Sequence, residues 1–381
     1  MNRLIAALSA LFISAAPAMS SPALRVEDER EIVTDEQREA VKRGLAWLAE
    51  HQAADGSWRA NVGYKLNEDY NSTAVDRGHI GVTALAGMAF LAGGNLPARG
   101  EYGPEIERAL DFVLSKVRDD GYITSSGSRM YSHAFATLFL AEIYGMTHRE
   151  DVRKKLQQAV DFIVKSQNAQ GGWRYEPYAA ESDMSIVVCQ VLALRAARNI
   201  GIRVPKTTVD KAARYVVKSA VTEQSARGVR YGRFNYVNEV GSFHYQPESA
   251  SRSSFTLTAA GVTALHGVGI YSDQAIERGI EYLIREHQPF NKRWGLRNRN
   301  KGHYFFWYGH YYAVQAFYTY GNKFQSTVWT QYFERLRGDL LSLQNKDGSW
   351  PNDVGPGLAF GTAAACLILE IPYRFLPIFQ R

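Results

Sequence analysis

The chain has little cysteine and no dense cluster of charge. Its 381 residues include two cysteines, Cys189 and Cys366, and each lies in an apolar segment of helical character. Two such residues do not make a disulfide scaffold, so the sequence predicts two buried free thiols. The 44 basic and 38 acidic residues are spread along the chain, without the Lys/Arg blocks that are typical of nucleic-acid binding. We therefore expect no nucleic-acid partner, while the net charge of +6 suits an anionic ligand.

Apolar runs of membrane-spanning length are also absent. Residues 1–20 contain one basic residue, an apolar run from Leu4 to Ala16, and small residues after it. The run is too short to cross a bilayer as a helix and is typical of a secretory signal peptide that is removed. An uncleaved anchor is the alternative. We expect residues 21–33 to be a linker and 34–381 to form one domain, which is secreted or periplasmic and does not span a membrane.

What the sequence does contain is a repeated phrase in which Gln precedes Trp by six positions. The copies are QAADGSW (52–58), QNAQGGW (167–173), QPFNKRW (288–294) and QNKDGSW (344–350). The first and last Gln are 292 residues apart (344 − 52), which makes five intervals of about 58. Periods of this length indicate a repeat architecture.

Each repeat reads as a helix with one apolar stripe, a Gly-containing loop, and a second helix that is apolar nearly all round. The position four before each Gln is apolar, so we expect the first helices to share a buried face. The first helices are predicted at 34–52, 104–118, 147–167, 207–220, 272–287 and 325–344, and the second at 79–94, 130–145, 183–200, 253–269, 303–320 and 358–371. Polar-faced helices outside and apolar helices inside, six times over, predict an all-α (α/α)6 toroid of two concentric rings.

Local signals support this arrangement. TDEQ and THRE predict capping boxes, with Thr34 and Thr147 as the helix caps. We interpret the repeated Gln and Trp as scaffold residues. The Gln would satisfy free carbonyls at the end of its own helix, and the Trp would pack over the junction to the next hairpin.

The repeated phrase resembles the QW motif of the terpenoid-cyclase and protein-prenyltransferase toroid superfamily, the prenyltransferase/squalene oxidase repeat. The resemblance covers essentially the whole chain after the predicted signal peptide. Unit two, however, has only DDGY at 119–122, and an insertion interrupts unit four. It implies the toroid fold, but the superfamily's activity motifs are missing: there is no DxDD, no DDxxD and no GCGEQ thioester. Where the resemblance implies the zinc-binding D-x-C of prenyltransferases, the chain has Asp183-Met184-Ser185. We therefore expect no cofactor and no metal.

In such a toroid the loops after the first helices surround one mouth, where six helix N-termini meet. The polar residues after each loop would form the rim of this mouth, above an aromatic well supplied largely by 303–320. The candidate catalytic residues are Asp183, His133, Tyr131 and Arg252. The candidate ligand-binding residues are Asp76, His79, Arg174, Tyr175, His303, Tyr304, Trp307, Tyr308 and His310. Asp183 also suits a helix cap, and His133 a hydrogen-bonded core histidine. The long loop 221–250 is typical of a lid or binding segment.

Two functions of different classes follow, and the sequence leaves open whether the protein is an enzyme. The first is an exported toroid that binds an apolar or isoprenoid-like ligand, or a protein partner, in its aromatic well. The alternative is a carbohydrate-active enzyme, most plausibly a lyase on acidic polysaccharide. QNAQGGWRYEPY (167–178) resembles the Gly-Gly-Trp region of one pectate-lyase family. A base such as Tyr131, His133 or Arg252 would then remove the proton beside a neutralised carboxylate.

Overall fold

The structure, a computed structural model, describes residues 33–64, 72–231, 234–247, 251–295, 302–324 and 327–379. The predicted signal peptide (1–20) and the linker up to residue 32 lie outside the described residues. Over the described residues the chain forms twelve α-helices in alternating outer and inner positions. The outer helices are α2 (Asp35–Glu50), α4 (Gly103–Ser115), α6 (Glu150–Ser166), α8 (Lys206–Lys218), α10 (Gln274–Trp294) and α12 (Val328–Leu343). The inner helices are α3 (Ile80–Ala92), α5 (Met130–Thr147), α7 (Met184–Asn199), α9 (Phe255–Gly267), α11 (Tyr304–Phe324) and α13 (Leu358–Glu370).

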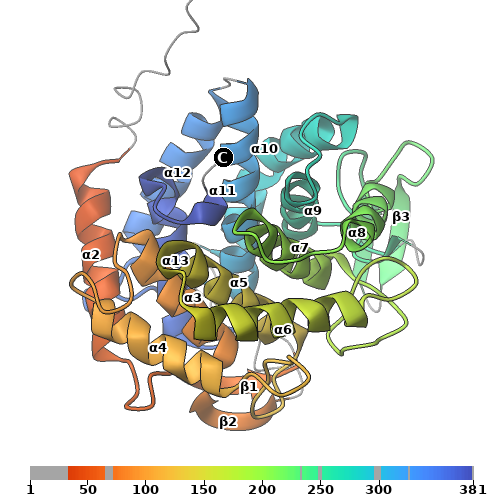
Figure 1. The fold of residues 1–381 in the computed structure, drawn as a ribbon. Coiled ribbons are helices and arrows are strands. Elements are labelled where there is room, and N and C mark those ends of the chain that lie inside the picture. The colour runs from red at the N-terminus through yellow and green to blue at the C-terminus, as the bar shows by residue number, and fades with distance from the viewer. Residues whose placement is uncertain are drawn as a thin grey trace, which may run out of the picture.

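The inner helices form a closed ring. Each of them packs on the next in the order α3, α5, α7, α9, α11 and α13, and α13 returns to α3 (Figure 1). The outer helices surround this ring, and α12 meets α2 where the two ends of the chain join. Two short 3₁₀ helices, η2 (Ile371–Tyr373) and η3 (Pro377–Phe379), follow α13. The predicted (α/α)6 toroid is confirmed.

Burial explains the two rings. Every one of the 13 residues of α3 is buried, whereas α8 buries only four of 13. A helix that is apolar all round needs neighbours on all sides, and an amphipathic one needs them on a single face. The predicted free thiols are confirmed as well, since Cys189 on α7 and Cys366 on α13 are both buried and unbridged.

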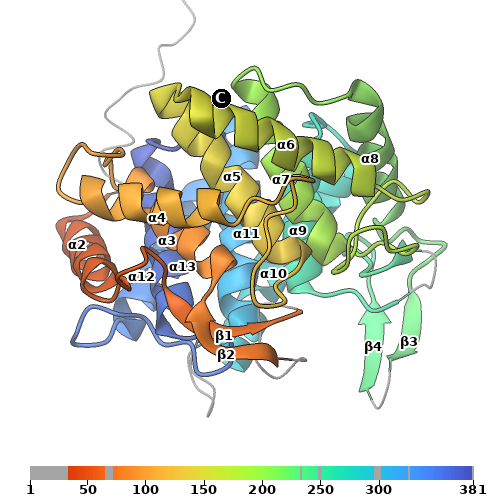
Figure 2. The ribbon, with the colours of Figure 1, turned by 60° about the horizontal axis from the view of Figure 1, so that its bottom comes forward.

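Two short hairpins were not predicted. Strand β1 (Arg59–Gly63) pairs antiparallel with β2 (Ser72–Gly78), and β3 (Arg227–Tyr231) pairs with β4 (Phe234–Asn238). Each joins the end of an outer helix to the start of an inner one, so both project from the face where the inner helices begin (Figure 2). The second hairpin occupies part of the predicted lid or binding segment, residues 221–250.

The repeated Trp side chains hold the helix ends, a role that we had expected of the Gln. The indole N–H of Trp58 donates to Leu48 O (2.9 Å), that of Trp173 to Ile163 O (2.8 Å), and that of Trp350 to Leu340 O (2.8 Å). In each case the acceptor lies four residues before the Gln. The Trp can do this because its loop doubles back over the last turn of the helix, so one buried ring both packs and satisfies a free carbonyl.

The Gln side chains instead tie neighbouring outer helices together. Each amide donates to a carbonyl within its own loop and to a second carbonyl on the next outer helix. The second acceptors are Glu105 O for Gln52 (2.8 Å), Thr208 O for Gln167 (2.9 Å) and Ala40 O for Gln344 (2.8 Å). These bonds link α2 to α4, α6 to α8, and α12 to α2.

A loop glycine with positive φ recurs in more of the repeat units than the Gln or the Trp does. Gly56 has a φ of +83°, and a Cβ there would lie 2.2 Å from Arg108 O on α4. The same close approach to the next outer helix recurs at Gly121, Gly171, Gly241 and Gly348, each with positive φ. Units two and four therefore keep the loop although they lack the Trp.

Unit four contains a copy of the loop that our reading of the sequence missed, Gly241-Ser242-Phe243. The backbone N–H of Phe243 donates to Thr258 Oγ1 (3.2 Å), as that of Trp58 donates to Thr83 Oγ1 (3.1 Å). The insertion precedes this copy. Gly-Ser before an aromatic residue was the signal that could have located it.

The fourth predicted copy, QPFNKRW, is not a loop. Helix α10 continues through Gln288 and Pro289 to Trp294, and Ile284, which we expected to be buried, is 47% exposed. The segment lacks the positive-φ loop glycine that follows the other outer helices and approaches the next one closely, and here the helix runs on to Trp294.

One of the two predicted capping boxes was wrong and the other is half formed. Thr147 is the last residue of α5, and α6 begins after Arg149, which provides no side-chain cap. Thr34 caps α2 as predicted, with Gln37 N–H donating to its hydroxyl (3.2 Å). The Gln37 amide, however, donates to Leu369 O (2.6 Å), because it packs against the inner ring and does not reach back.

Candidate functional site

A small cavity lies where α5, α7, α9 and α11 begin, at the mouth that the sequence predicted. Its volume is about 60 Å³, and five tyrosines line it: Tyr131, Tyr175, Tyr245, Tyr304 and Tyr308. Ser185, Arg252, Thr256, Leu257 and Phe305 complete the wall, in which Tyr304 and Phe305 are half-buried.

Two of these tyrosines are positioned by hydrogen bonds between repeat units. The first N–H of α5, on Met130, donates to Tyr175 O (3.0 Å), and the first N–H of α7, on Met184, donates to Tyr245 O (3.0 Å). Each loop thus satisfies a free N–H at the start of the preceding inner helix. The same bond turns the loop's tyrosine toward the cavity.

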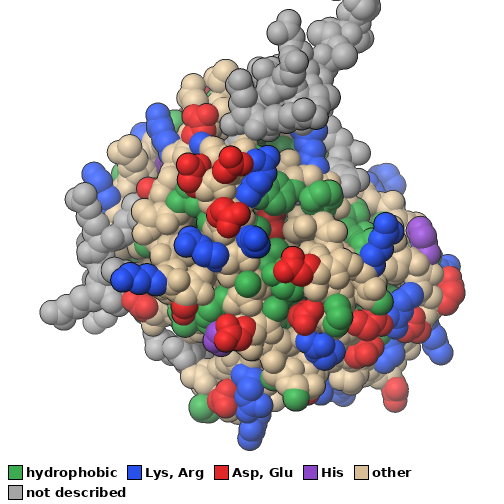
Figure 3. Space-filling view, turned by 90° about the vertical axis from the view of Figure 1, so that its left-hand side faces the viewer, with side chains coloured by type: hydrophobic (Ala, Val, Ile, Leu, Met, Phe, Trp, Pro, Cys, Tyr) green, Lys and Arg blue, Asp and Glu red, His purple; other side chains and the backbone are tan. Residues whose placement is uncertain are grey.

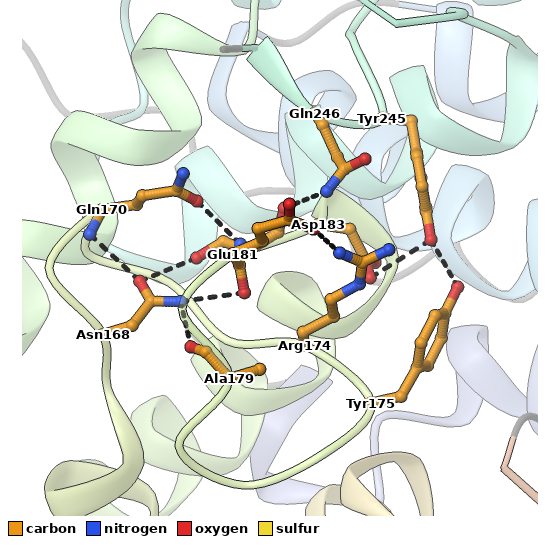
Figure 4. A network of polar contacts seen from close by, with 10 residues as sticks. Asn168, Gln170, Arg174, Tyr175, Ala179, Glu181, Asp183, Tyr245 and Gln246 are labelled. Atoms are coloured by element: carbon orange, nitrogen blue, oxygen red, sulfur yellow. Dashed lines mark hydrogen bonds and ion pairs between the residues drawn. The ribbon is translucent and has the colours of Figure 1, made fainter. Parts of the chain in front are cut away.

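The tyrosines connect to a buried carboxylate. The hydroxyls of Tyr175 and Tyr245 are 2.6 Å apart, and Tyr245 donates to Asp183 Oδ2 (3.3 Å), as Figure 4 shows. Asp183 Oδ1 accepts from Ile186 N–H (3.1 Å) and from the Ser185 hydroxyl (2.5 Å), so the side chain is also the N-cap of α7. Burial raises the pKa of Asp183 against these lowering hydrogen bonds. Asp183 therefore lies behind the cavity wall and acts on the cavity through Tyr245.

The loop that carries Tyr175 is braced from within. Asn168 Nδ2 donates to Ala179 O and to Glu181 O (2.9 Å each), while Gln170 Oε1 accepts from Ser182 N–H (2.7 Å). Arg174 forms an ion pair with Glu181 in the same loop (Figure 4). Arg174, a predicted ligand contact, thus closes the loop and does not line the cavity.

The cavity tyrosines are proton donors at neutral pH. Burial raises the pKa of Tyr131, Tyr175 and Tyr308 well above the ordinary value of a phenol, and the neighbouring Asp183 raises it further. Tyr308 donates to Ser185 O (3.1 Å). A neutral phenol can donate and accept hydrogen bonds, but it does not serve as a ready base.

Below the cavity, side chains fill the axis of the ring. Tyr312 OH lies 3.0 Å from Cys189 Sγ, and the Tyr311 ring packs edge-on against Phe135 at 6.3 Å. Burial raises the pKa of the Cys189 thiol to about 12. The aromatic well expected from 303–320 is therefore largely occupied by its own side chains, and the small cavity described above lies at its upper end.

Three predicted residues of the mouth have structural partners away from the cavity. His133 accepts from Ile123 N–H (3.1 Å) and packs on Phe162, in the place that Thr83 and Thr258 take in their units. Burial lowers its pKa to about 3. His79 caps α3 by accepting from Val82 N–H (3.3 Å), and burial lowers its pKa to about 4. Asp76 pairs with Arg59 on the exposed β1–β2 hairpin.

On α11 the predicted residues separate by helix face. Tyr304 and Tyr308 reach the cavity, whereas Trp307 turns away and donates to Pro351 O (3.0 Å). His310 lies between Tyr332 OH and Asn291 Oδ1, at 2.7 Å from each, and burial lowers its pKa. His303 accepts from Phe305 N–H (3.1 Å) just before the helix begins.

An aromatic cluster extends the cavity outward. It consists of Trp294, His303, Tyr304 and Phe305, with ring centroids 4.3 to 5.1 Å apart between neighbours. We call these four residues the rim cluster.

Our sequence analysis missed Tyr245, Phe305 and Trp294 as site residues. Tyr245 stands two residues after Phe243, as Tyr175 stands two after Trp173. Recognition of the Gly241-Ser242-Phe243 loop would have revealed it.

Other site types find no support in the described chain. Within these residues no group of three or more His, Cys, Asp and Glu side chains is arranged to hold a metal. None of the described helices combines the length and apolar composition needed to cross a bilayer. On the face drawn in Figure 3, basic and acidic side chains are intermingled and form no region of a single sign.

No protein-family model and no curated protein matches the sequence. Solved structures do. The chain is similar to cellobiose 2-epimerase from Bacillus thermoamylovorans (TM-score 0.60, 15% identity, 91% of this chain and 99% of that one). It is also similar to an α-1,6-mannanase of Salegentibacter (0.60, 9%, 88% and 98%) and to a type II terpene cyclase from Scytonema (0.58, 13%, 90% and 100%). At these identities the comparisons show a shared α/α toroid fold, which serves both sugar and terpene chemistry.

Proposed function

We propose that the protein binds an apolar, isoprenoid-like ligand at this mouth. The ligand's polar end enters the tyrosine cavity, and its apolar body lies on the rim cluster. The proposal rests on the observation that the tyrosine cavity and the rim cluster form one continuous surface. Tyr304 belongs to the rim cluster and also lines the cavity, beside the hydroxyl-bearing Tyr131 and Tyr308. An apolar face that leads into a few convergent polar groups is the usual form of a ligand site.

The size of the cavity decides which part of the ligand enters. Drug-sized ligands occupy roughly 300–1,000 Å³, and an engineered cavity of about 150 Å³ holds benzene. A cavity of about 60 Å³ admits only a hydroxyl, carbonyl or carboxyl group. The neutral tyrosines around it would hydrogen-bond such a group, and Tyr245 would be held in place by Asp183.

A structural neighbour gives this ligand class a precedent. One of the terpene cyclase structures was solved in complex with geranylgeranyl dihydroxybenzoate, an isoprenoid chain attached to a hydroxylated ring. This chain lacks the DxDD motif of class II cyclases, so the proposal is binding, with no cyclisation step. It includes export to a secreted or periplasmic location, which rests on the apolar segment within residues 1–20.

A second candidate is a lyase on acidic polysaccharide, and Arg252 favours it. Its guanidinium lies 5.2 Å from the Tyr245 ring centroid in the cavity wall, where it suits a uronate carboxylate. Against it, Tyr131 is held protonated and His133 is turned away from the cavity. Of the candidate bases, Arg252 is the one left in the wall, and guanidinium does not release a proton at neutral pH.

Equilibrium titration separates the two candidates. Trp294 in the rim cluster provides a fluorescence signal for binding of farnesol or of an oligogalacturonate to the purified protein. The isoprenoid proposal predicts saturable quenching by farnesol. Leu257→Trp, which adds bulk to the cavity wall, should weaken it, and Ile284→Trp, an equal change at an exposed site, should not. Quenching by the oligogalacturonate alone, with release of unsaturated uronides, would establish the lyase and overturn the proposal.

A further inference from the structure

A second cavity lies at the opposite end of the inner ring. Its volume is about 240 Å³, and it opens where α7, α9 and α11 end, beneath Ile378 of η3. It shares no lining residue with the tyrosine cavity. A ligand here would therefore be independent of the function proposed above.

Among the described residues, two cations line this cavity, Arg195 and Lys323, and no acidic residue does. Arg195 of α7 donates one hydrogen bond to His266 O (3.1 Å) and lies 6.0 Å from the Tyr271 ring centroid. A guanidinium has five N–H donors, and among the described residues Arg195 meets no carboxylate. Lys323, in the last turn of α11, likewise forms no ion pair within the described chain. Within the described chain no carboxylate neutralises these two charges, of which that of Lys323 is exposed to solvent and that of Arg195 is half-buried.

Two buried polar atoms at this cavity have no partner in the described chain. They are Nδ1 of His266, a residue only 2% exposed, and Nδ2 of Asn322. Burial lowers the pKa of His266 to about 3, and the charge of Arg195 adds to this effect, so the imidazole is neutral. Buried polar atoms are almost always hydrogen-bonded, so two unpaired ones beside one cavity indicate a missing polar partner.

The rest of the wall combines aromatic and aliphatic side chains with Thr263, Gln315 and Thr319, and its aromatic part suits a flat body. The rings of His266 and Tyr271 lie nearly parallel, 5.8 Å apart at 14°. Tyr318 and Leu192 also line the space. Since a cavity of about 150 Å³ can hold benzene, this one has room for a ring that carries one further polar group.

We propose that this cavity binds a small organic carboxylate with a planar, apolar body. The carboxylate accepts hydrogen bonds from Arg195 and Asn322, with Lys323 adding positive charge. The body packs against Tyr271 and Tyr318. Charge-assisted bonds of this kind are the strongest that the wall offers, which selects an anion over a neutral molecule of the same shape.

Isothermal titration calorimetry of the full protein tests the proposal, with benzoate as the probe and benzamide as its neutral analogue. Benzoate should bind saturably, with a dissociation constant on the order of 1 mM or tighter. Benzamide should bind about 10-fold more weakly or not measurably, since it lacks the charge. Arg195→Gln, which keeps an amide donor near His266 O, should weaken benzoate binding about 10-fold. The matched control is Arg198→Gln, an exposed position one turn further along α7, and it should leave the affinity unchanged.

Three results would overturn the proposal: no saturable heat with benzoate, equal affinity for benzamide, or full affinity in Arg195→Gln. Far-UV circular dichroism checks that the variant is folded. If Arg195→Gln does not fold, Asn322→Leu takes its place with the same expected loss. The comparison of benzoate with benzamide on the unaltered protein decides the charge requirement in either case.

Discussion

The amide of Gln344 donates to Ala40 O (2.8 Å), and this bond joins residues 304 positions apart. It links the last outer helix to the first and so closes the outer ring. The same amide also donates to Gly348 O (2.9 Å) in its own loop. Gln52 and Gln167 make equivalent pairs of bonds elsewhere in the ring.

Gln344→Ala should lower the free energy of unfolding by about 2 kcal/mol, because the two hydrogen bonds that its amide donates are lost with their acceptors left partly buried, together with the exposed one that its Oε1 accepts from Arg43. Urea denaturation followed by circular dichroism measures this change. Gln331→Ala on the exposed side of α12 is the control and should change the stability by less than about 0.5 kcal/mol. Equal effects of the two substitutions would refute the closing role of Gln344.

Gly241→Ala should lower the free energy of unfolding by more than a Gly→Ala substitution at another residue with positive φ. The φ of Gly241 is +92°, and a Cβ there would lie 2.6 Å from Arg278 O. Gly201 has a similar φ of +84° with nothing within 4 Å, so Gly201→Ala measures the backbone strain alone. That strain is about 1–2 kcal/mol. The destabilisation by Gly241→Ala should exceed this strain by at least about 1 kcal/mol, because the backbone at Arg278 must also shift to make room for the Cβ. Equal melting temperatures for the two variants would show that the close approach to α10 is unimportant.

Glu142 should make the protein less stable as the pH rises. Burial raises the pKa of this carboxyl to about 8, although its Oε2 accepts from Ile378 N–H. A raised folded-state pKa gives stability that is complete below the unfolded pKa of about 4.5 and is lost as the pH rises through about 8. Glu142→Gln should therefore gain roughly 3–5 kcal/mol relative to the unaltered protein at pH 8.5, and little at pH 4. Urea denaturation at both pH values measures it; an equal difference at the two would contradict the assignment.

Tyr245→Phe should weaken the link between the cavity and Asp183. The substitution removes the donor to Asp183 Oδ2 and the partner of Tyr175 OH, at a cost of about 1–3 kcal/mol. It should also weaken farnesol binding, because Tyr175 and Asp183 lose their common contact. Tyr282→Phe, at a buried tyrosine of outer helix α10, is the control for loss of one phenolic hydroxyl. Unchanged farnesol binding in Tyr245→Phe would show that Asp183 does not contribute to the site.

The fold could be predicted because its determinants repeat along the chain. Apolar residues at helical spacing, a period of about 58 residues and a loop glycine recur whether or not the Trp is present. The hairpins could not be predicted in the same way. Strand β1, for example, is five residues long and carries no repeated signal. The end of α10 was misplaced because Gln288 and Trp294 matched the motif, although the segment lacks the loop glycine of the other copies.

The site was predicted in part. The tyrosines Tyr131, Tyr175 and Tyr308, together with Arg252, do meet at the mouth. The other predicted residues miss the cavity because of their position along each inner helix. His133 is four residues after its helix cap and contacts the loop, as Thr83 does four residues after His79. The size of the cavity follows from the packing of Tyr311 and Tyr312 across the ring, which no local pattern encodes.

Identification of what the protein carries is the most direct test of the central claim. The protein would be purified from its native cells and denatured, and the released small molecules would be analysed by mass spectrometry beside the Leu257→Trp variant. The account predicts an isoprenoid lipid in near-stoichiometric amount from the unaltered protein and much less from the variant. Unsaturated uronic oligosaccharides, or no ligand from either protein, would contradict it.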